Sequence, residues 1–148
     1  MKWRDETILD MKNSEIENLG RLSQSEVAKL YQKASVFFYP THFAEIHCIS
    51  VCKAQMAKCF PITTDFAALG ESNKFGVKTH SNKNKDNWSK PYQLHFGVDN
   101  EDEQKKLVDA VVKQLKNPQK IAGKEYEDWK KNIVWGTISK KWIEQLKQ

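Results

Sequence analysis

The chain has 148 residues, which is enough for one domain with a buried core. Charged residues make up 29% and hydrophobic residues 39% of it, a soluble globular profile. The net charge of +5 comes from lysines spread along the chain, so it indicates a solvated basic surface or an anion-binding face. No arginine-rich arm supports a dedicated nucleic-acid binder.

The N-terminal stretch MKWRDETILDMK has acids where a signal peptide needs apolar residues, and the apolar run at 36–39 is too short to span a membrane. The three cysteines are Cys48, Cys52 and Cys59. Their spacing is not that of a zinc finger, and no second Cys or His pair completes a metal site. We therefore expect a cytoplasmic protein with reduced thiols in its core.

The predicted elements begin with a short helix over 5–12 and a short strand over 16–19 that ends at Gly20. Ser23 and Glu26 then form the S-x-x-E pattern of a capping box, which opens a helix. The apolar residues of this helix recur at helical spacing. They are Val27, Leu30, Tyr31 and Ala34.

Strands and helices alternate in the next part of the chain. We expect strands at 36–39, 60–64 and 75–79, and helices at 46–57 and 66–69. Asp65 can cap the second of these helices. The order strand, helix, strand, helix, strand implies a parallel sheet with right-handed crossovers. With the strand at 16–19, this predicts an α/β fold, a partial doubly wound sheet of about four strands.

The C-terminal half is expected to be helical. Residues 80–100 are polar and lack a helical period, so they are interpreted as a loop or insertion with room for a strand at 93–96. Helices follow over 101–116, from 119 to 131, and at the C-terminus. The residues of the first that are expected to face inward are Leu107, Val108, Val111, Val112 and Leu115. The apolar stripe of the last helix consists of Trp135, Ile138, Trp142 and Leu146. Trp129, Trp135 and Trp142 are expected in the core.

Glu45 is a lone acid between the strand at 36–39 and the helix that follows. In open α/β sheets, ligands bind at the carboxyl ends of strands. The amides at the start of that helix, at 46–49, are placed to meet a phosphate or diphosphate. Glu45 could accept hydrogen bonds from sugar hydroxyls, or it could simply cap an exposed loop.

The four histidines are weaker candidates. His42 and His47 lie in the loop around Glu45 and could contact a ligand or face solvent. No two of His42, His47, His80 and His95 have a spacing that suggests a shared metal. Ser50 and the cysteines have no base at hand for nucleophilic catalysis.

Residues 39–71, YPTHFAEIHCISVCKAQMAKCFPITTDFAALGE, resemble the donor-binding half of retaining GT-B glycosyltransferases related to glycogen and sucrose synthases. That family carries an acid, seven residues and a second acid; Glu45 matches the first, and Lys53 stands at the second position. AQMAKCFPITTD resembles the family's A-x-x-x-G-x-P-V-x-x-T/S-D, 69–71 resembles its L-x-E, and VWGTISKKWIEQL resembles its last helix. The likeness covers roughly 15–79 and, more loosely, 101–146.

The resemblance implies transfer of a sugar from a nucleotide-sugar donor with retention of configuration. It implies a catalytic, sugar-orienting role for Glu45, no redox cofactor and usually no metal. The donor-binding residues that it implies are Thr41, Glu45, Ile46, His47, Cys48, Ile49 and Lys53. The acceptor is not indicated.

Three positions depart from the family pattern. Lys53 cannot accept bonds from ribose hydroxyls as a carboxylate does, although it could meet a phosphate oxygen or mark a different donor. Because helical side chains lean toward the N-terminus, we expect its ammonium to be directed back toward the loop around Glu45. Cys48 replaces a glycine that is common after the first acid. Cys59 stands where the family has a helix-ending glycine, so either it adopts a left-handed conformation at a cost of about 1 kcal/mol or the helix ends differently.

The family has two further strands before 16–19 and a whole acceptor-binding N-terminal domain. Residues 1–148 therefore resemble the last third of such an enzyme, and we expect no turnover or tight donor binding by this chain alone. Strand 16–19 is expected to pair directly with 36–39; otherwise 36–39 is left as an exposed edge. The alternatives are a non-catalytic binding module or inactive fragment and, more weakly, a basic nucleic-acid-binding domain.

Overall fold

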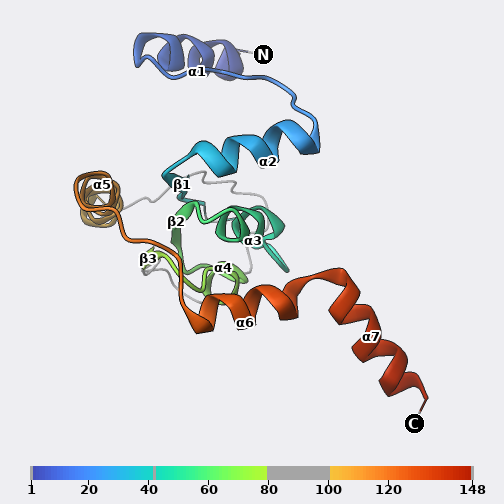
Figure 1. Cartoon of the computed structure of the whole chain (residues 1–148). Coiled ribbons are helices and arrows are strands. Elements are labelled where there is room, and N and C mark those ends of the chain that lie inside the picture. Colours follow the sequence, from blue (N-terminus) through green and yellow to red (C-terminus); the bar gives the residue numbers. More distant parts are fainter. Residues whose placement is uncertain (1, 42, 80–100, 148) are drawn as a thin grey trace, which may run out of the picture.

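A parallel sheet lies at the centre of the molecule (Figure 1). The computed structural model describes residues 2–41, 43–79 and 101–147. In these residues the sheet has three strands in the order β1 (Val36–Tyr39), β2 (Phe60–Thr64) and β3 (Val77–Thr79). Val36 lies opposite Phe60, and Ile62 lies opposite Val77. Both pairings are parallel, so the carboxyl ends of the three strands lie at the same edge of the sheet. The α/β fold and the parallel sheet are as predicted from the sequence.

Helices cover the sheet on both faces. In chain order they are α1 (Lys2–Asn13), α2 (Gln24–Lys33), α3 (Ile49–Met56), α4 (Leu69–Ser72), α5 (Glu101–Lys116), α6 (Lys124–Ile133) and α7 (Trp135–Leu146). Figure 1 shows α5 on one face and α3 with α4 on the other, and both sides contact β2. α1 lies beyond α2, at the end of an extended connection, and α7 leads away from the sheet at the other end.

Two apolar clusters form the core, one on each face of the sheet. Because alternate strand residues point to opposite faces, Val36 packs with the first cluster and Phe37 with the second. The first cluster contains Phe60, Ile62, Leu107, Ile121 and Tyr126. The second contains Cys48, Val51 and Leu69. All three cysteines are buried free thiols, as expected.

The strand predicted at 16–19 is wrong. Ile16 is 54% exposed and Leu19 is 45% exposed, and the segment has no ladder. Its polar backbone groups find local partners: the Ile16 N–H donates to Met11 at the end of α1, and the Gly20 N–H donates to the Asn18 side chain. The segment has only two apolar side chains, which is too little apolar surface to hold it against the sheet. Local turns therefore take the place of strand pairing. Among the described residues, β1 is therefore an edge strand, which is the alternative outcome.

Several element boundaries differ from the sequence prediction. α3 begins at 49 instead of 46, α4 covers 69–72 instead of 66–69, and β3 begins at 77 instead of 75. Asp65 does not cap α4, whose N-cap is Ala68. α6 begins at 124 instead of 119, because the Gln114 side chain binds both the N–H and the carbonyl of Gln119 and holds that residue outside a helix. The strand predicted at 93–96 lies outside the described residues.

The predicted helices over 5–12 and 101–116 are present, and so is the capping box at the start of α2. Their buried faces are partly different. α5 turns Leu107 and Val111 toward the sheet, but Val108, Val112 and Leu115 are exposed, because Ala110 and Gln114 take the inner positions. Trp129 packs against the core as expected. Trp135 and Trp142, however, are 73% and 58% exposed, so their predicted burial is wrong.

The C-terminus of α3 resolves the question about Cys59. The Cys59 N–H bonds to the Ala54 carbonyl and the Lys58 N–H bonds to the Gln55 carbonyl, both at 2.9 Å. This is the Schellman pattern, in which the residue before the last donor is left-handed. That residue is Lys58, with φ of 62°. The helix thus ends one residue earlier than a glycine at 59 would indicate, and Cys59 is free to be buried.

We expect Lys58→Gly to raise the free energy of unfolding by about 1 kcal/mol, because glycine adopts a positive φ without a Cβ clash. The Lys58 ammonium lies 5.6 Å from the Tyr126 ring centre, so a small cation–π contribution is lost. Urea unfolding followed by circular dichroism measures the change. Lys58→Ala is the control: it removes the same ammonium but keeps the strain, so it should give no gain. An equal gain in both variants would contradict this explanation.

Candidate functional site

Glu45 lies at the carboxyl end of β1. It is half-buried, and the hydroxyl of Tyr39, the last residue of β1, donates to Glu45 Oε1 at 2.7 Å. The Glu45 carbonyl oxygen accepts from the Ala68 N–H at 3.3 Å. The loop between β1 and α3 is thus tied both to its own strand and to the turn before α4. These two bonds fix Glu45 at the edge of the sheet that the sequence indicated.

Cys48 is buried near the Glu45 carboxyl group. Burial, and secondly the nearby Glu45 carboxyl group, raise the pKa of Cys48 to about 12. Burial, followed by the bond to Glu45, raises the pKa of Tyr39 to about 12. Both groups therefore stay protonated at neutral pH and can donate to the carboxyl group. A protonated thiol is a poor nucleophile. The expectation that no base lies near a cysteine is wrong for Cys52, because His47 Nε2 lies 3.7 Å from its Sγ.

The amides expected to bind an anion are placed differently. Because α3 begins at Ile49, Ile46 and His47 lie before the helix, with Cys48 at the N-cap position. The Cys48 N–H donates to the Ser72 hydroxyl at 3.3 Å, and the Ile49 N–H donates to the His47 carbonyl at 3.1 Å. An anion at these two amides would have to displace the bonds already made.

The other residues of the loop divide into buried and exposed ones. Thr41 is buried, and its carbonyl accepts from the Thr64 hydroxyl at 2.6 Å, which joins the carboxyl ends of β1 and β2. His47 is exposed, with Nε2 3.7 Å from Cys52 Sγ. Ile46 is 99% exposed. His42, His80 and His95 lie outside the described residues.

Lys53 lies in the middle of α3 and is exposed. Its ammonium donates to Gln24 Oε1, on the first residue of α2, at 2.6 Å. The expected partner was the loop around Glu45, whereas this bond joins α3 to α2. A ligand that recruits Lys53 must therefore compete with Gln24.

Sequence reasoning missed the residues that hold Glu45 and Cys48 in place. Tyr39 was interpreted only as part of a buried strand, and Ser72 was not singled out. A phenol at the last position of a strand, six residues before a lone acid, could have indicated the first of these bonds. The Ser72 bond to Cys48 spans 24 residues and has no local signal.

A pocket of about 300 Å³ lies at the opposite edge of the sheet. It is lined by Phe60 and Val77, the first residues of β2 and β3, and by α5 side chains that include Lys106 and Lys113. Glu45 is at the carboxyl edge, so this pocket does not lie beside it.

Within the described part of the chain, no group of three or more His, Cys, Asp or Glu side chains is arranged to hold a metal ion. The helices described are also too short or too polar to cross a bilayer. Comparison with protein families, with curated proteins and with solved structures gives no match for this chain.

Proposed function

We propose that this chain forms part of the nucleotide-sugar site of a cytoplasmic retaining glycosyltransferase, with the remaining walls supplied by a longer protein. The observation that carries the proposal is the placement of Glu45: a half-buried acid at the carboxyl end of a parallel strand, held there by Tyr39. Ligands of open α/β sheets bind at that edge. The family resemblance around Glu45 supplies the substrate class.

In this proposal Glu45 orients the donor sugar, which is a positioning role. The Tyr39 hydroxyl fixes one carboxyl oxygen, so the carboxyl group is pre-oriented before a ligand arrives. A diphosphate leaving group would lie at the first turn of α3, where the helix dipole favours negative charge. Thr41 anchors the loop to β2, because its carbonyl accepts from the Thr64 hydroxyl. In this proposal Thr41 does not itself contact the ligand.

The second candidate is a non-catalytic binding module. It is favoured by Lys53, because the position at which the family has its ribose-binding acid holds an ammonium already bonded to Gln24. Such a module would recognise the phosphates of a nucleotide and leave the sugar and ribose uncontacted.

Backbone amide NMR of the chain, titrated with nucleotide sugars to about 10 mM, tests the proposal. Weak binding is expected, with shifts at Glu45, His47 and the start of α3. Glu45→Gln keeps an oxygen for the Tyr39 bond but removes the charge, and it should weaken binding about tenfold, since a hydrogen bond to a charged group contributes about 1.5 kcal/mol. Glu144→Gln, an exposed change on α7, is the matched control and should have no effect.

Two outcomes would count against this assignment. If no nucleotide sugar shifts the amide signals around Glu45, the assignment of a donor site to this loop is wrong. If the nucleoside diphosphate alone bound as tightly as its sugar conjugate and Glu45→Gln changed neither affinity, the binding module would be the better description, because Glu45 would then contact no sugar.

A further inference from the structure

α7 presents an apolar face to solvent. Trp135, Trp142, Ile143 and Leu146, called here the tryptophan face, are 73%, 58%, 53% and 86% exposed. Their spacing places them on one side of the helix. The two indole rings lie edge to face with their centres 6.3 Å apart, so they form one continuous surface. Single exposed apolar residues are ordinary, but two tryptophans with two aliphatic neighbours require an explanation.

Nothing in the described part of the chain covers this face. α7 packs against α6, where the Lys141 ammonium donates to Asn132 Oδ1 at 2.9 Å. From there the helix leads away from the sheet, and its end lies beyond the rest of the molecule (Figure 1).

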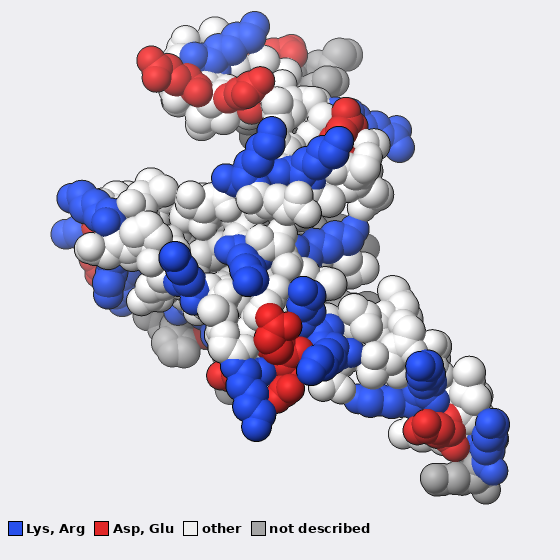
Figure 2. Space-filling view, in the orientation of Figure 1, with Lys and Arg blue, Asp and Glu red and all other residues white. Residues whose placement is uncertain are grey.

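The segment that bears this face is also basic. Residues 129–147 contain five lysines against one glutamate. Figure 2 shows basic side chains along α6 and α7, beside uncharged surface. On the helix, Lys140 and Glu144 lie on the side opposite Trp135, which leaves the apolar face uninterrupted. An apolar face with tryptophan and a lysine-rich polar face is the pattern of helices that lie in a membrane interface.

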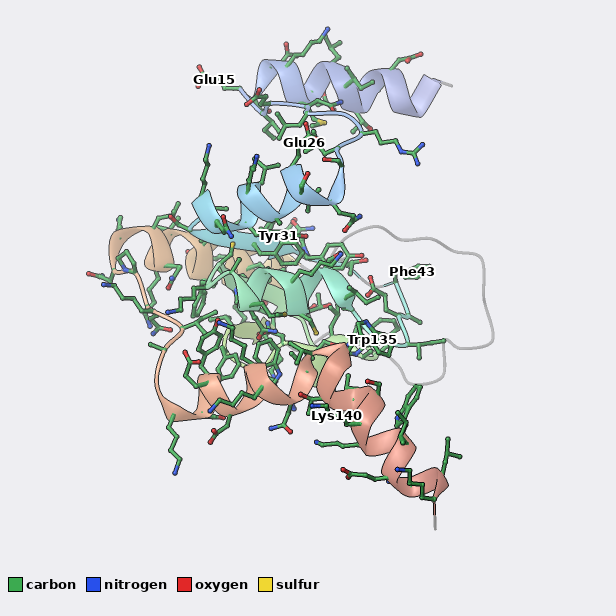
Figure 3. All side chains as sticks on the ribbon, turned by 45° about the vertical axis from the view of Figure 1, so that its right-hand side comes forward. Glu15, Glu26, Tyr31, Phe43, Trp135 and Lys140 are labelled. Atoms are coloured by element: carbon green, nitrogen blue, oxygen red, sulfur yellow. The ribbon has the colours of Figure 1, made fainter. Side chains whose placement is uncertain are left out.

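The loop before α3 and the first residue of α3 also expose apolar side chains. Phe43, Ile46 and Ile49 are 54%, 99% and 59% exposed. In Figure 3 the labelled Phe43 of this loop and Trp135 at the start of α7 lie on the same side of the molecule.

We propose that the tryptophan face docks on the surface of a bilayer that contains anionic phospholipid, with α7 lying in the plane of the headgroups. Tryptophan rings and lysine side chains are both favoured at that depth, and the basic segment is complementary to the lipid charge. A second copy of the chain fits less well, because it would bring two lysine-rich segments together. The proposal does not depend on the donor site.

Co-sedimentation with vesicles tests it, using pure phosphatidylcholine and phosphatidylcholine with about 30% phosphatidylglycerol. The intact chain should bind the anionic vesicles at about 50 mM salt, and much less at about 500 mM. Trp135→Ser with Trp142→Ser should lower the partition coefficient at least about tenfold, because two buried indoles are lost. Val108→Ser with Val112→Ser, a pair of exposed apolar residues on α5, is the matched control and should bind normally.

A blue shift of tryptophan emission on binding, lost in the Trp135/Trp142 variant, would support the assignment of the surface. No binding to the anionic vesicles, or an equal loss in the α5 control, would overturn the proposal. The proposal would also be overturned if the intact chain eluted as a dimer in size-exclusion chromatography and the Trp135/Trp142 variant eluted as a monomer. A second copy of the chain would then cover the tryptophan face. Circular dichroism of each variant establishes that it is folded.

Discussion

Gly76→Ala should destabilise the chain by about 3 kcal/mol, the upper range for inserting a group into a packed core. Gly76 lies just before β3, directly beside the central strand β2. A Cβ on Gly76 would overlap the Pro61 carbonyl oxygen and would lie 2.6 Å from Pro61 Cγ and 2.8 Å from Asn73 Oδ1. Two of these three groups belong to β2, which is held between strands on both sides, so they cannot move aside cheaply.

Gly136→Ala is the matched control for this change. Gly136 lies in α7, and a Cβ there would meet nothing within 4 Å. Alanine should therefore stabilise the helix by about 0.5–1 kcal/mol through its higher helix propensity. Urea unfolding of both variants, followed by circular dichroism, gives the two signs. If Gly76→Ala lowered the free energy of unfolding by less than about 1 kcal/mol, β2 and the start of β3 could not be as close as they are in this structure.

Elements with a strong local signal were predicted with correct bounds. β2 is a run of apolar and β-branched residues, and α5 stops at the Asn117–Pro118 pair as expected. The capping box of α2 needs only the two side chains Ser23 and Glu26, three residues apart. Each of these features depends on neighbours in sequence, which is why sequence alone identifies them.

Elements whose ends depend on distant groups were predicted less well. α3 was expected to begin at Ile46, but the Cys48 N–H is bonded to Ser72, and this contact directs the chain before the helix starts. The apolar stripes of α5 and α7 were identified correctly as stripes. Periodicity shows that a helix has an apolar face but not whether this chain covers it, so the exposure of Val108 and Trp142 could not be predicted.

The same division holds at the candidate site. The position of Glu45 follows from the order of strand, loop and helix, which the sequence shows. Its contacts with Tyr39 and Cys48 depend on the path of the loop, which the sequence does not show. The expected approach of Lys53 to the loop was based on helix geometry alone, and Gln24 of α2 takes its ammonium because α2 packs against α3.

A buried glutamine connects α3 to the turn that leads into β3. Gln55 is fully buried, and its Nε2 donates to the Ser72 carbonyl at 2.8 Å. Its Oε1 accepts from the backbone N–H groups of Lys74 and Phe75 at 2.8 and 3.0 Å. One side chain therefore satisfies three backbone groups, one at the end of α4 and two in the turn before β3. The position of β3 on the sheet depends on this turn, since Gly76 and Val77 follow it directly.

Gln55→Leu should lower the free energy of unfolding by about 3–5 kcal/mol, because leucine fills a similar volume but leaves two donors and one acceptor without partners at a cost of about 1–3 kcal/mol each. Gln32→Leu, the same substitution at an exposed position of α2, should change it by less than about 0.5 kcal/mol. Urea unfolding compares the two, and amide exchange at Lys74 and Phe75 locates the effect, since these N–H groups should lose their protection first. A Gln55→Leu chain as stable as the Gln32→Leu control would mean that water replaces the side chain, and that the turn into β3 is open to solvent.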